Sequence, residues 1–393
     1  MTAVEPASTT LDAAGIVARA TQIARESAAP AAAEVDAESR FPREAMDALR
    51  EAGLLGALIP VERGGLGQSL DTVARTVTEL AKHCSSAAMV YAMHQIQVAC
   101  LVAHGHTGTL REFTRAVAQR GLLLASATSE VGIGGDVRSS TCAVVVSGSR
   151  FTLVKQAPVI SYGEYADAIL VTARRTPDSP PSDQVLVVSP SDSLTLQRRS
   201  GWDALGFRGT CSLGYLLTAE GDTALILPDA FGDISSQTML PVSHILWSAL
   251  WYGIALAAAD RARAYVQAAA HKSPGAPPPS ALRLAELTTL LQQFQELVEG
   301  TRGRYAAARD DVDVTGSIGF AIAMNSLKVA ASTLVVDVVQ RSMLICGMAG
   351  YTNRGPYSLG RLLRDAIGAQ LMVNNDRINA NNSQLLLIHR EGF

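Results

Sequence analysis

Cysteine is scarce in this sequence and irregularly spaced. The 393 residues contain five cysteines, at positions 84, 100, 142, 211 and 346, and no two of them form a C-x-x-C pair. An odd number without that spacing argues against a disulfide framework and against a structural zinc site. We therefore expect free thiols, no bound metal and a cytoplasmic location.

Charged residues are also few, and neither sign predominates. They make up 18% of the chain and leave a net charge of −3. Lysine and arginine are scattered, so the basic surface that a nucleic-acid partner requires is not predicted. The first ten residues lack both the basic stretch and the apolar core of a signal peptide. We expect residues 1–10 to form a disordered tail.

No apolar run is long enough to predict a membrane span. Residues 234–259 contain no Asp, Glu, Lys or Arg, but their strongly apolar part, "ILWSALWYGIALAAA", covers only fifteen residues. A spanning helix needs about 20. This segment therefore predicts a buried helix and no membrane association.

The distribution of apolar residues divides the chain into three parts. Residues 11–118 show helical periodicity, with Gly and Pro at the ends of the periodic segments. Residues 119–227 contain short β-branched segments separated by Gly, Pro, Asp and Ser, which favours antiparallel strands over βαβ units. Residues 228–393 are again helical. The order predicts an α+β fold with a β domain between two helical domains.

A glycine-rich loop, "SATSEVGIGGDVRSS", opens the β segment. A dinucleotide-binding G-x-G-x-x-G motif needs a third glycine and a following helix. Here the third position is Val137, and the next segment, "TCAVVVSG", is strand-like. The loop therefore does not match a nicotinamide-dinucleotide fingerprint.

Five segments resemble the acyl-CoA dehydrogenase family in the right order. They are "LLGALIPVERGGLGQSLDTVARTVTELAKHC", "ATSEVGIGGD", "ADAILVTAR", "GWDALGFRGT" and "CGMAGYTNRGPYSLGRLLRDA". The resemblance implies an N-terminal helical domain, a central antiparallel β-barrel or sandwich and a C-terminal helical bundle. It also implies FAD (FMN being possible), an acyl thioester carried by CoA or by a carrier protein, an electron acceptor, and a homodimer or homotetramer.

The resemblance also implies roles for individual residues. Ser129 and Ser161 fall where hydroxyls bond the flavin ring, and Gly134 and Gly135 would let the backbone approach the pyrophosphate. The implied cofactor residues are Thr128, Ser129, Gly134, Gly135, Ile160, Ser161, Arg208, Gly347 and Gly350. The implied substrate residues are His94, Tyr351 and Arg364.

The sequence departs from the family at the general base. The two positions that carry the family's catalytic glutamate fall on Val373 and Ser243, and neither is a carboxylate. The replacement candidates are His244, with Ser243 beside it, and Asp376. An imidazole accepts protons near neutral pH.

Three functions stay open at this point. One is dehydrogenation of an acyl thioester with a non-standard base. Another is monooxygenation by flavin that a reductase partner has reduced, which needs no glutamate. The third is a non-catalytic protein with the flavoprotein fold.

Overall fold

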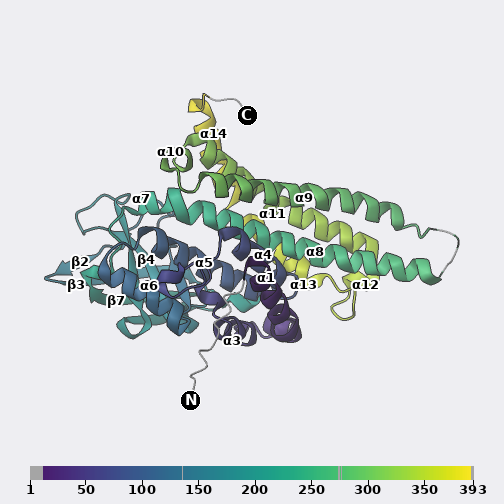
Figure 1. Ribbon diagram of the computed structural model, residues 1–393, viewed down its shortest axis with the longest axis horizontal. Coiled ribbons are helices and arrows are strands. Elements are labelled where there is room, and N and C mark those ends of the chain that lie inside the picture. Colours follow the sequence, from purple (N-terminus) through teal and green to yellow (C-terminus); the bar gives the residue numbers. More distant parts are fainter. Residues whose placement is uncertain (1–11, 135, 273–274, 276, 391–393) are drawn as a thin grey trace, which may run out of the picture.

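The protein consists of a mixed helical and β body from which long C-terminal helices extend (Figure 1). The computed structural model describes residues 12–134, 136–272, 275 and 277–390. The predicted tail, 1–10, and Gly135 lie outside these residues. Within the described ranges the order of elements is helices, then seven strands, then helices. This confirms the predicted architecture of two helical domains with a β domain between them.

The N-terminal helices pack around α4 and α5. Asp12, Ser69 and Thr107 cap α1, α4 and α6 by accepting hydrogen bonds from backbone N–H groups in the first turn. The helices are α1 Ala13–Ile23, α2 Ala29–Ala37, α3 Arg43–Glu51, α4 Leu70–Ala81, α5 Ser85–His104 and α6 Gly108–Arg120.

The β domain contains two sheets. One has the strand order β1–β4–β5 and the other β2–β3–β7–β6. β4 and β5 are almost wholly buried, whereas β3 mostly alternates between buried and exposed residues. The strands are β1 Leu124–Ala127, β2 Val145–Ser147, β3 Arg150–Ile160, β4 Ala168–Arg174, β5 Gln184–Pro190, β6 Leu194–Ser200 and β7 Leu213–Asp222.

One strand pairing corrects the prediction of a wholly antiparallel domain. β1 and β4 pair in parallel, with Leu124 opposite Ala168. A parallel pair needs a long crossover connection. Here β2 and β3 of the other sheet form that connection, so local sequence patterns gave no sign of it.

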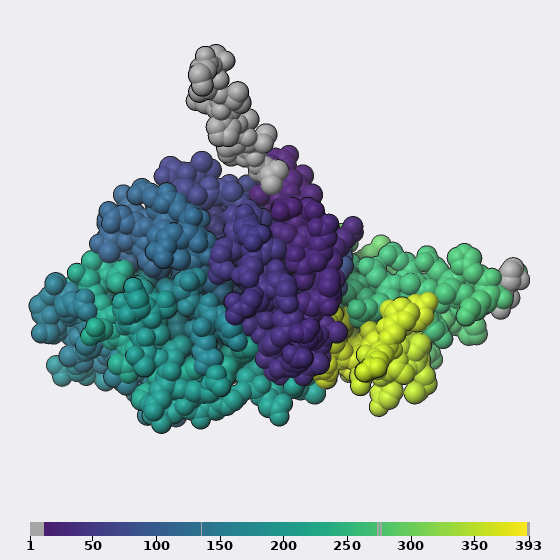
Figure 2. Space-filling view, turned by 90° about the horizontal axis from the view of Figure 1, so that it is seen from below, coloured from purple at the N-terminus to yellow at the C-terminus, as the bar shows by residue number. Residues whose placement is uncertain are grey.

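The C-terminal domain is a bundle built on three long helices that lie side by side. Its elements are α7 Phe231–Ile234, the π-helical turn Ser235–Met239, α8 Leu240–Lys272, α9 Ala281–Ala308, α10 Val312–Thr315, α11 Ile318–Cys346, α12 Met348–Tyr351, α13 Gly360–Leu371 and α14 Asn375–Ile388. The far ends of α8 and α9, in green, project beyond the rest of the molecule (Figure 2).

Three helical stretches of the described chain are long and apolar enough to cross a membrane, judged by length and composition alone. They are α5, the continuous stretch Phe231–Lys272 and α11. In the first two, 78% of the most apolar window is buried inside the protein, and in α11 44%. α5 and α8 therefore use their apolar residues mainly for internal packing.

Candidate functional site

The glycine-rich loop begins directly after β1. Its first two residues carry hydroxyl groups that have no hydrogen-bond partner among the described residues. Thr128 and Ser129 are half-buried, and their hydroxyls make no hydrogen bond within the described part of the chain. Gly132 and Gly134 have φ of 93° and 58°, and a Cβ at either would meet nothing within 4 Å. Only glycine adopts such conformations easily. The loop thus presents hydroxyls and accessible backbone to open space.

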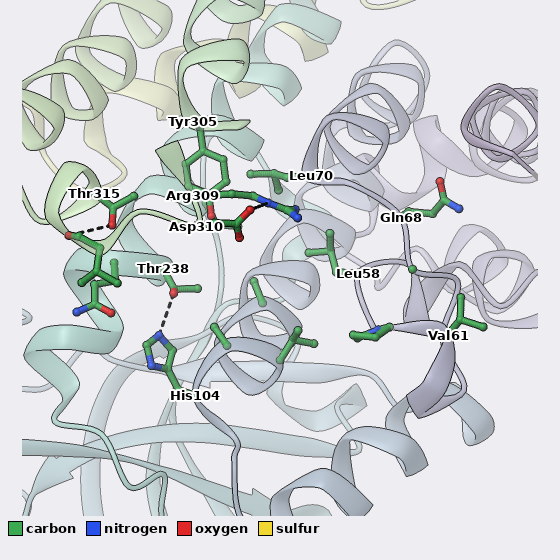
Figure 3. Close-up of a pocket in the computed structure, with 18 of the residues that line it drawn as sticks. Leu58, Val61, Gln68, Leu70, His104, Thr238, Tyr305, Arg309, Asp310 and Thr315 are labelled. Atoms are coloured by element: carbon green, nitrogen blue, oxygen red, sulfur yellow. Dashed lines mark hydrogen bonds and ion pairs between the residues drawn. The ribbon is translucent and has the colours of Figure 1, made fainter. Parts of the chain in front are cut away.

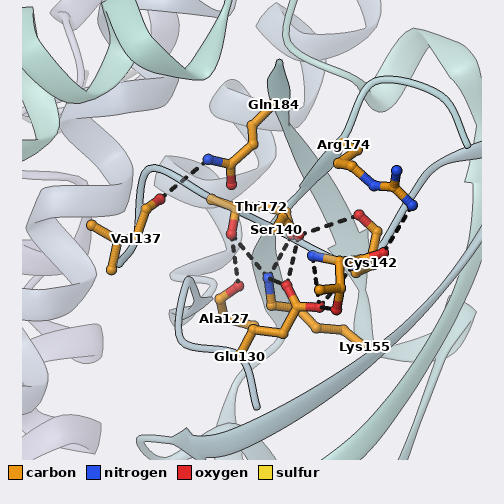
Figure 4. Close-up of polar contacts among 10 residues, drawn as sticks. Ala127, Glu130, Val137, Ser140, Cys142, Lys155, Thr172, Arg174 and Gln184 are labelled. Carbon is orange, nitrogen blue, oxygen red and sulfur yellow. Dashed lines mark hydrogen bonds and ion pairs between the residues drawn. The ribbon is translucent and has the colours of Figure 1, made fainter. Parts of the chain in front are cut away.

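A buried ion pair anchors this loop to the β domain (Figure 4). The Lys155 ammonium lies 3.2 Å from the Glu130 carboxylate, and the two side chains are 0% and 2% exposed. The carboxylate also accepts hydrogen bonds from the Ser140 hydroxyl at 2.6 Å and from the Cys142 N–H at 2.7 Å, and one from the Thr141 hydroxyl. Glu130 is therefore fully engaged and holds the loop in position.

Hydrogen bonds outweigh burial in setting the charge of Glu130. Burial alone would raise its pKa, but the bonds from Ser140 and Thr141 and the charge of Lys155 hold it below its usual value. Burial lowers the pKa of Lys155, against the opposing effect of Glu130. No local sequence pattern predicts this pair, although Glu130 directly follows Ser129.

The loop is bonded to the middle of β3. The Val131 N–H donates to the Gln156 carbonyl at 2.9 Å, which joins the loop to β3. Ser161 follows the buried Ile160, and its hydroxyl lies 2.7 Å from that of Ser212. Ser161 therefore directly follows β3, the strand to which the loop is bonded.

These residues fit a flavin ring. Val131 of the loop and Val159 of β3 leave 54% and 38% of their surface exposed. An apolar surface next to unpaired hydroxyls suits a flat heterocycle with polar edges. Val159 replaces the tryptophan that the family resemblance predicts, so the stacking surface is smaller.

Two arginines predicted for the cofactor and the substrate both contact Asp36. The Arg208 Nε donates to the Asp36 carbonyl at 2.8 Å, and Arg364 Nη1 donates to the Asp36 carboxylate at 3.0 Å. The neighbouring Asp365 accepts from the Phe207 N–H at 2.6 Å, and burial raises its pKa to about 6. These contacts join the three domains, and both guanidinium groups are occupied in them.

His94 is enclosed in the core. Its Nε2 lies 2.8 Å from the Leu55 carbonyl, and its Nδ1 accepts from the Leu124 N–H at 3.0 Å. Because the carbonyl can only accept, Nε2 carries the proton and the ring is neutral. Burial lowers its pKa to about 4. Both nitrogens are bonded to backbone, so neither is available to a ligand.

Of the two predicted glycines of the C-terminal domain, Gly347 directly precedes α12 and Gly350 lies within it. Gly347 has φ of 56°, and a Cβ on Gly350 would come within 2.8 Å of the Cys346 side chain. Tyr351 is 69% exposed, and Met348 beside it is 72% exposed. In the described chain this segment presents apolar groups outward.

The candidate bases lie around the start of α8. His244 is 2% exposed, and its Nδ1 lies 3.0 Å from the Met324 carbonyl of α11. Nδ1 therefore carries the proton, and Nε2 keeps its lone pair. Burial lowers the pKa of His244 to about 4. The Ser243 hydroxyl donates to the Met239 carbonyl at 2.5 Å, which occupies its proton.

A buried lysine holds the turn at Val373. Lys328 of α11 donates to the Val373 carbonyl at 2.9 Å and to Asn375 Oδ1 at 2.7 Å. Burial lowers its pKa to about 8. Val373 itself is 46% exposed with φ of 42°, and Asp376 is exposed in the first turn of α14. Lys328 therefore holds the backbone at Val373, whereas the side chains of Val373 and Asp376 are both exposed.

A cavity of about 340 Å³ opens between the β domain and the C-terminal helices. Met324, whose carbonyl holds His244, lines it, as do Phe231, Leu240 and Phe320. Among the described residues that line it, Arg138 is the one charged side chain, and there is neither a carboxylate nor an imidazole. The cavity suits a partly apolar substrate, and His244 lies behind its wall.

Two family models match most of the helical parts of the chain. "Acyl-CoA dehydrogenase, N-terminal domain" matches residues 11–119, and "Acyl-CoA dehydrogenase, C-terminal domain" matches residues 234–376. Cyclohex-1-ene-1-carbonyl-CoA dehydrogenase of Syntrophus aciditrophicus is 24% identical over 358 residues, which cover 89% of this chain and 83% of that protein.

Solved structures share the fold over nearly the whole chain. Butyryl-CoA dehydrogenase from Megasphaera elsdenii gives a TM-score of 0.78 at 19% identity, covering 98% of this chain and 100% of that one. FMN-bound TdsC from Paenibacillus sp. A11-2, a dibenzothiophene monooxygenase, gives 0.81 at 20%, covering 96% and 98%. The domain models, the length of the sequence match and the shared fold agree, and the chain belongs to the acyl-CoA dehydrogenase superfamily of flavoprotein oxidoreductases.

Proposed function

We propose that this protein is a flavin-dependent oxidoreductase that dehydrogenates an acyl thioester at its α and β carbons, with His244 as the base. The observation that carries the proposal is the bond from Nδ1 to the Met324 carbonyl at 3.0 Å. It fixes the tautomer, so that Nε2 can accept a proton. A neutral imidazole replaces the glutamate that the resemblance implies at Val373 or Ser243.

The flavin would bind at the end of the β domain. Thr128, Ser129 and Ser161 offer hydroxyls to its ring, Ile160 supports the strand end, and Gly134 leaves room for its phosphates. FAD is the family's usual cofactor, and FMN is the alternative. When bound, the flavin supplies a two-electron acceptor, and an external electron acceptor would reoxidise it.

A pKa of about 4 makes His244 a weak base, which restricts the substrate. Proton transfer to a weak base is efficient only when the carbon acid is itself activated. We therefore expect a thioester whose α carbon carries a second carbonyl group beside its alkyl chain, because the α-hydrogen is then acidified while a β-hydrogen can still leave as hydride. The carrier is CoA or an acyl carrier protein. Of the three substrate residues that the resemblance implies, Tyr351 is exposed, whereas His94 and Arg364 are bonded within the protein.

A homodimer or homotetramer accompanies this proposal. Large apolar side chains of the C-terminal helices are exposed in the single chain, among them Leu344, Met348, Tyr351 and Leu371. Apolar surface gathered on one part of a protein favours contact with another subunit. Gly347 and Gly350 lie in this same region, where a neighbouring subunit could complete a cofactor site.

A monooxygenase is the second candidate, and one observation favours it. Among the described residues, no carboxylate or imidazole lines the cavity of about 340 Å³. Reduced flavin and oxygen hydroxylate a substrate without a protein base that removes an α-hydrogen. A flavin reductase would then be the partner.

Anaerobic spectroscopy separates the two candidates. We expect a 2-alkylmalonyl-CoA from a panel of thioesters to bleach the oxidised flavin band, because it has an acidified α-hydrogen and still has a β-hydrogen that can leave as hydride. His244→Gln should slow the bleaching by about 100-fold or more, because it removes a general base. Asp376→Asn tests the other candidate base, and a larger loss there would overturn the role of His244.

Other outcomes are equally informative. A yellow protein that no thioester bleaches, but that hydroxylates with a reductase and oxygen, would favour the monooxygenase. A colourless protein that cannot be reconstituted with FAD or FMN would exclude both enzymatic functions.

A further inference from the structure

A hydrogen-bonded chain of hydroxyl, imidazole and carboxylate lies at the end of α5, away from the loop of Thr128 and Ser129. His104 Nδ1 lies 2.6 Å from Asp229 Oδ2, and His104 Nε2 lies 2.9 Å from the Thr238 hydroxyl oxygen (Figure 3). His106 is the other basic group that faces Asp229, at 4.0 Å. The three residues come from three segments, α5, the loop before α7 and the π-helical turn.

The partners fix the direction of both hydrogen bonds. A carboxylate accepts, so His104 Nδ1–H donates to Asp229. In the neutral imidazole, Nε2 then carries a lone pair and accepts the proton of the Thr238 hydroxyl. This is the order of groups that activates a hydroxyl nucleophile: hydroxyl, base and a carboxylate that orients the base.

The hydroxyl faces a large cavity. Thr238 and His104 both line a space of about 620 Å³ between the N-terminal helices and the start of α8. Leu58, Leu70 and Val242 form apolar parts of its wall, and Gln237 and Arg309 add N–H donors. Figure 3 shows the His104 ring pointing toward Thr238 below Tyr305 and Arg309. An acyl group and a polar leaving group would both find suitable surfaces there.

The π-helical turn contributes to this geometry. Thr238 belongs to Ser235–Met239, where the helix widens before α8 begins. Such turns are rare and are frequent at functional sites, because the wider turn redirects a side chain. The Thr238 side chain is nearly buried, at 7% exposed, so the hydroxyl is shielded from bulk water.

We propose that Thr238, His104 and Asp229 form a second active site, which hydrolyses acyl esters or thioesters. Thr238 Oγ1 attacks the acyl carbonyl carbon while its proton passes to His104 Nε2. The bond from the carbonyl carbon to the leaving oxygen or sulfur then breaks, and His104 returns the proton to the leaving group. A water molecule attacks the acyl-threonine in the same way, giving a carboxylic acid and free Thr238.

The groups have distinct roles in this reaction. Thr238 and His104 are catalytic residues, since they would touch the reacting atoms. Asp229 is a positioning residue that holds the imidazole in the required tautomer. The Gln237 amide and the Arg309 guanidinium are the donors nearest to the carbonyl oxygen in this proposal; Arg309 Nε also bonds Asp310 of the same wall at 3.4 Å, and its Nη groups would make the contact. The reaction consumes only water and uses no electrons, so it does not depend on the proposed flavin chemistry.

The test uses the full-length protein and p-nitrophenyl acetate. We expect release of p-nitrophenolate and, after a short incubation, one acetyl group on Thr238 detected by peptide mass spectrometry. Thr238→Val and His104→Gln should each lower kcat/KM by about 100-fold or more, as loss of a nucleophile or a general base does. Thr238→Ser should retain hydrolysis. Asp229→Asn should lower kcat more than it raises KM.

A matched control and a direct probe guard against misfolding. Thr301→Val removes a hydroxyl that donates to a backbone carbonyl in α9 and lines neither cavity, and it should leave hydrolysis unchanged. Labelling of the unsubstituted protein with a fluorophosphonate, mapped to Thr238, needs no variant. Equal activity in Thr238→Val and the unsubstituted protein, or an acetyl group found only on other residues, would overturn the proposal.

Discussion

Two carboxylate-centred clusters of this protein differ in what surrounds them. Glu130 is enclosed by a lysine, two hydroxyls and two backbone N–H groups, and its side chain is 2% exposed. Asp229 is 38% exposed and bonds a histidine whose other nitrogen bonds the Thr238 hydroxyl in the wall of a cavity. Every acceptor position of the first cluster is used inside the fold, whereas the second ends on a hydroxyl that a ligand could reach.

The Glu130 cluster therefore has a structural role, whereas the Asp229 cluster has groups that can take part in a reaction. A buried charge must be paired, so the Glu130 cluster can only hold the loop that carries Thr128 and Ser129. The same contrast exists between two histidines of α5. His94 is bonded to backbone at both nitrogens, whereas His104 is bonded to two side chains, one of which is a nucleophile.

The enclosed histidines should make the protein sensitive to acid, and this is the largest effect we expect. Burial lowers the pKa of His94 and of His244 from 6.5 to about 4. The unfolded chain then binds more protons than the folded one below pH 6.5, so stability falls as the pH falls toward 4. At pH 4, each of the two histidines should lower the free energy of unfolding by about 3 kcal/mol relative to neutral pH.

Urea denaturation between pH 7 and pH 4 measures this loss. The double variant His94→Leu/His244→Phe serves as the control, since it should show a shallower dependence on pH. An equally steep dependence in that variant would assign the acid sensitivity to other groups.

Removing one partner from the enclosed ion pair should be the next largest effect. Glu130→Gln leaves the Lys155 ammonium buried without a counter-charge, which should cost about 3–5 kcal/mol of unfolding free energy. Asp229→Asn changes the cluster of Asp229, His104 and Thr238. It should lower the free energy of unfolding by about 1 kcal/mol or less, because Asp229 is partly exposed and water can replace the lost interaction with His104.

Denaturation midpoints of the two variants compare the clusters directly. Glu130→Gln/Lys155→Met should recover part of the loss, since it removes the unpaired charge. Equal destabilisation by Glu130→Gln and Asp229→Asn would contradict the expected difference between the buried Glu130 cluster and the partly exposed Asp229 cluster.

The two histidines of α5 allow the same comparison within one helix. His94→Leu leaves the Leu55 carbonyl and the Leu124 N–H buried without partners. It should therefore lower the free energy of unfolding by about 2–4 kcal/mol. His104→Leu should cost about 1 kcal/mol, because Asp229 is partly exposed to water, yet it should abolish ester hydrolysis. Thermal unfolding and p-nitrophenyl acetate turnover, measured on both variants, test this pattern; a larger stability loss for His104→Leu would contradict it.

The smallest change in stability is expected from substitutions of Val373, which lies in the turn before α14. A β-branched residue at φ of 42° is strained, and its side chain is 46% exposed, so little packing would be lost on its removal. Val373→Gly should therefore stabilise the protein by about 1 kcal/mol, and Lys328 should still bond the carbonyl at this position. Val373→Ala, which keeps a Cβ in the strained conformation, is the matched comparison, and equal stability of the two variants would exclude strain as the cause.

Much of the architecture follows from local sequence. The α–β–α order, the caps at Asp12, Ser69 and Thr107, and the break between α8 and α9 at a proline-rich segment all depend on residues close together in the chain. The loop of Thr128 and Ser129 was predicted in the same way, from its glycines and the strand after it. Short-range hydrogen bonds and periodicity determine these features.

Only the tertiary structure decided which polar groups meet. His104 and Thr238 are 134 residues apart, Glu130 and Lys155 are 25 apart, and the parallel pairing of β1 with β4 spans two strands of the other sheet. Periodicity locates apolar faces but carries no information on partners across the core. Which histidine is enclosed by backbone and which faces a cavity depends on packing between distant segments, and no local pattern encodes it.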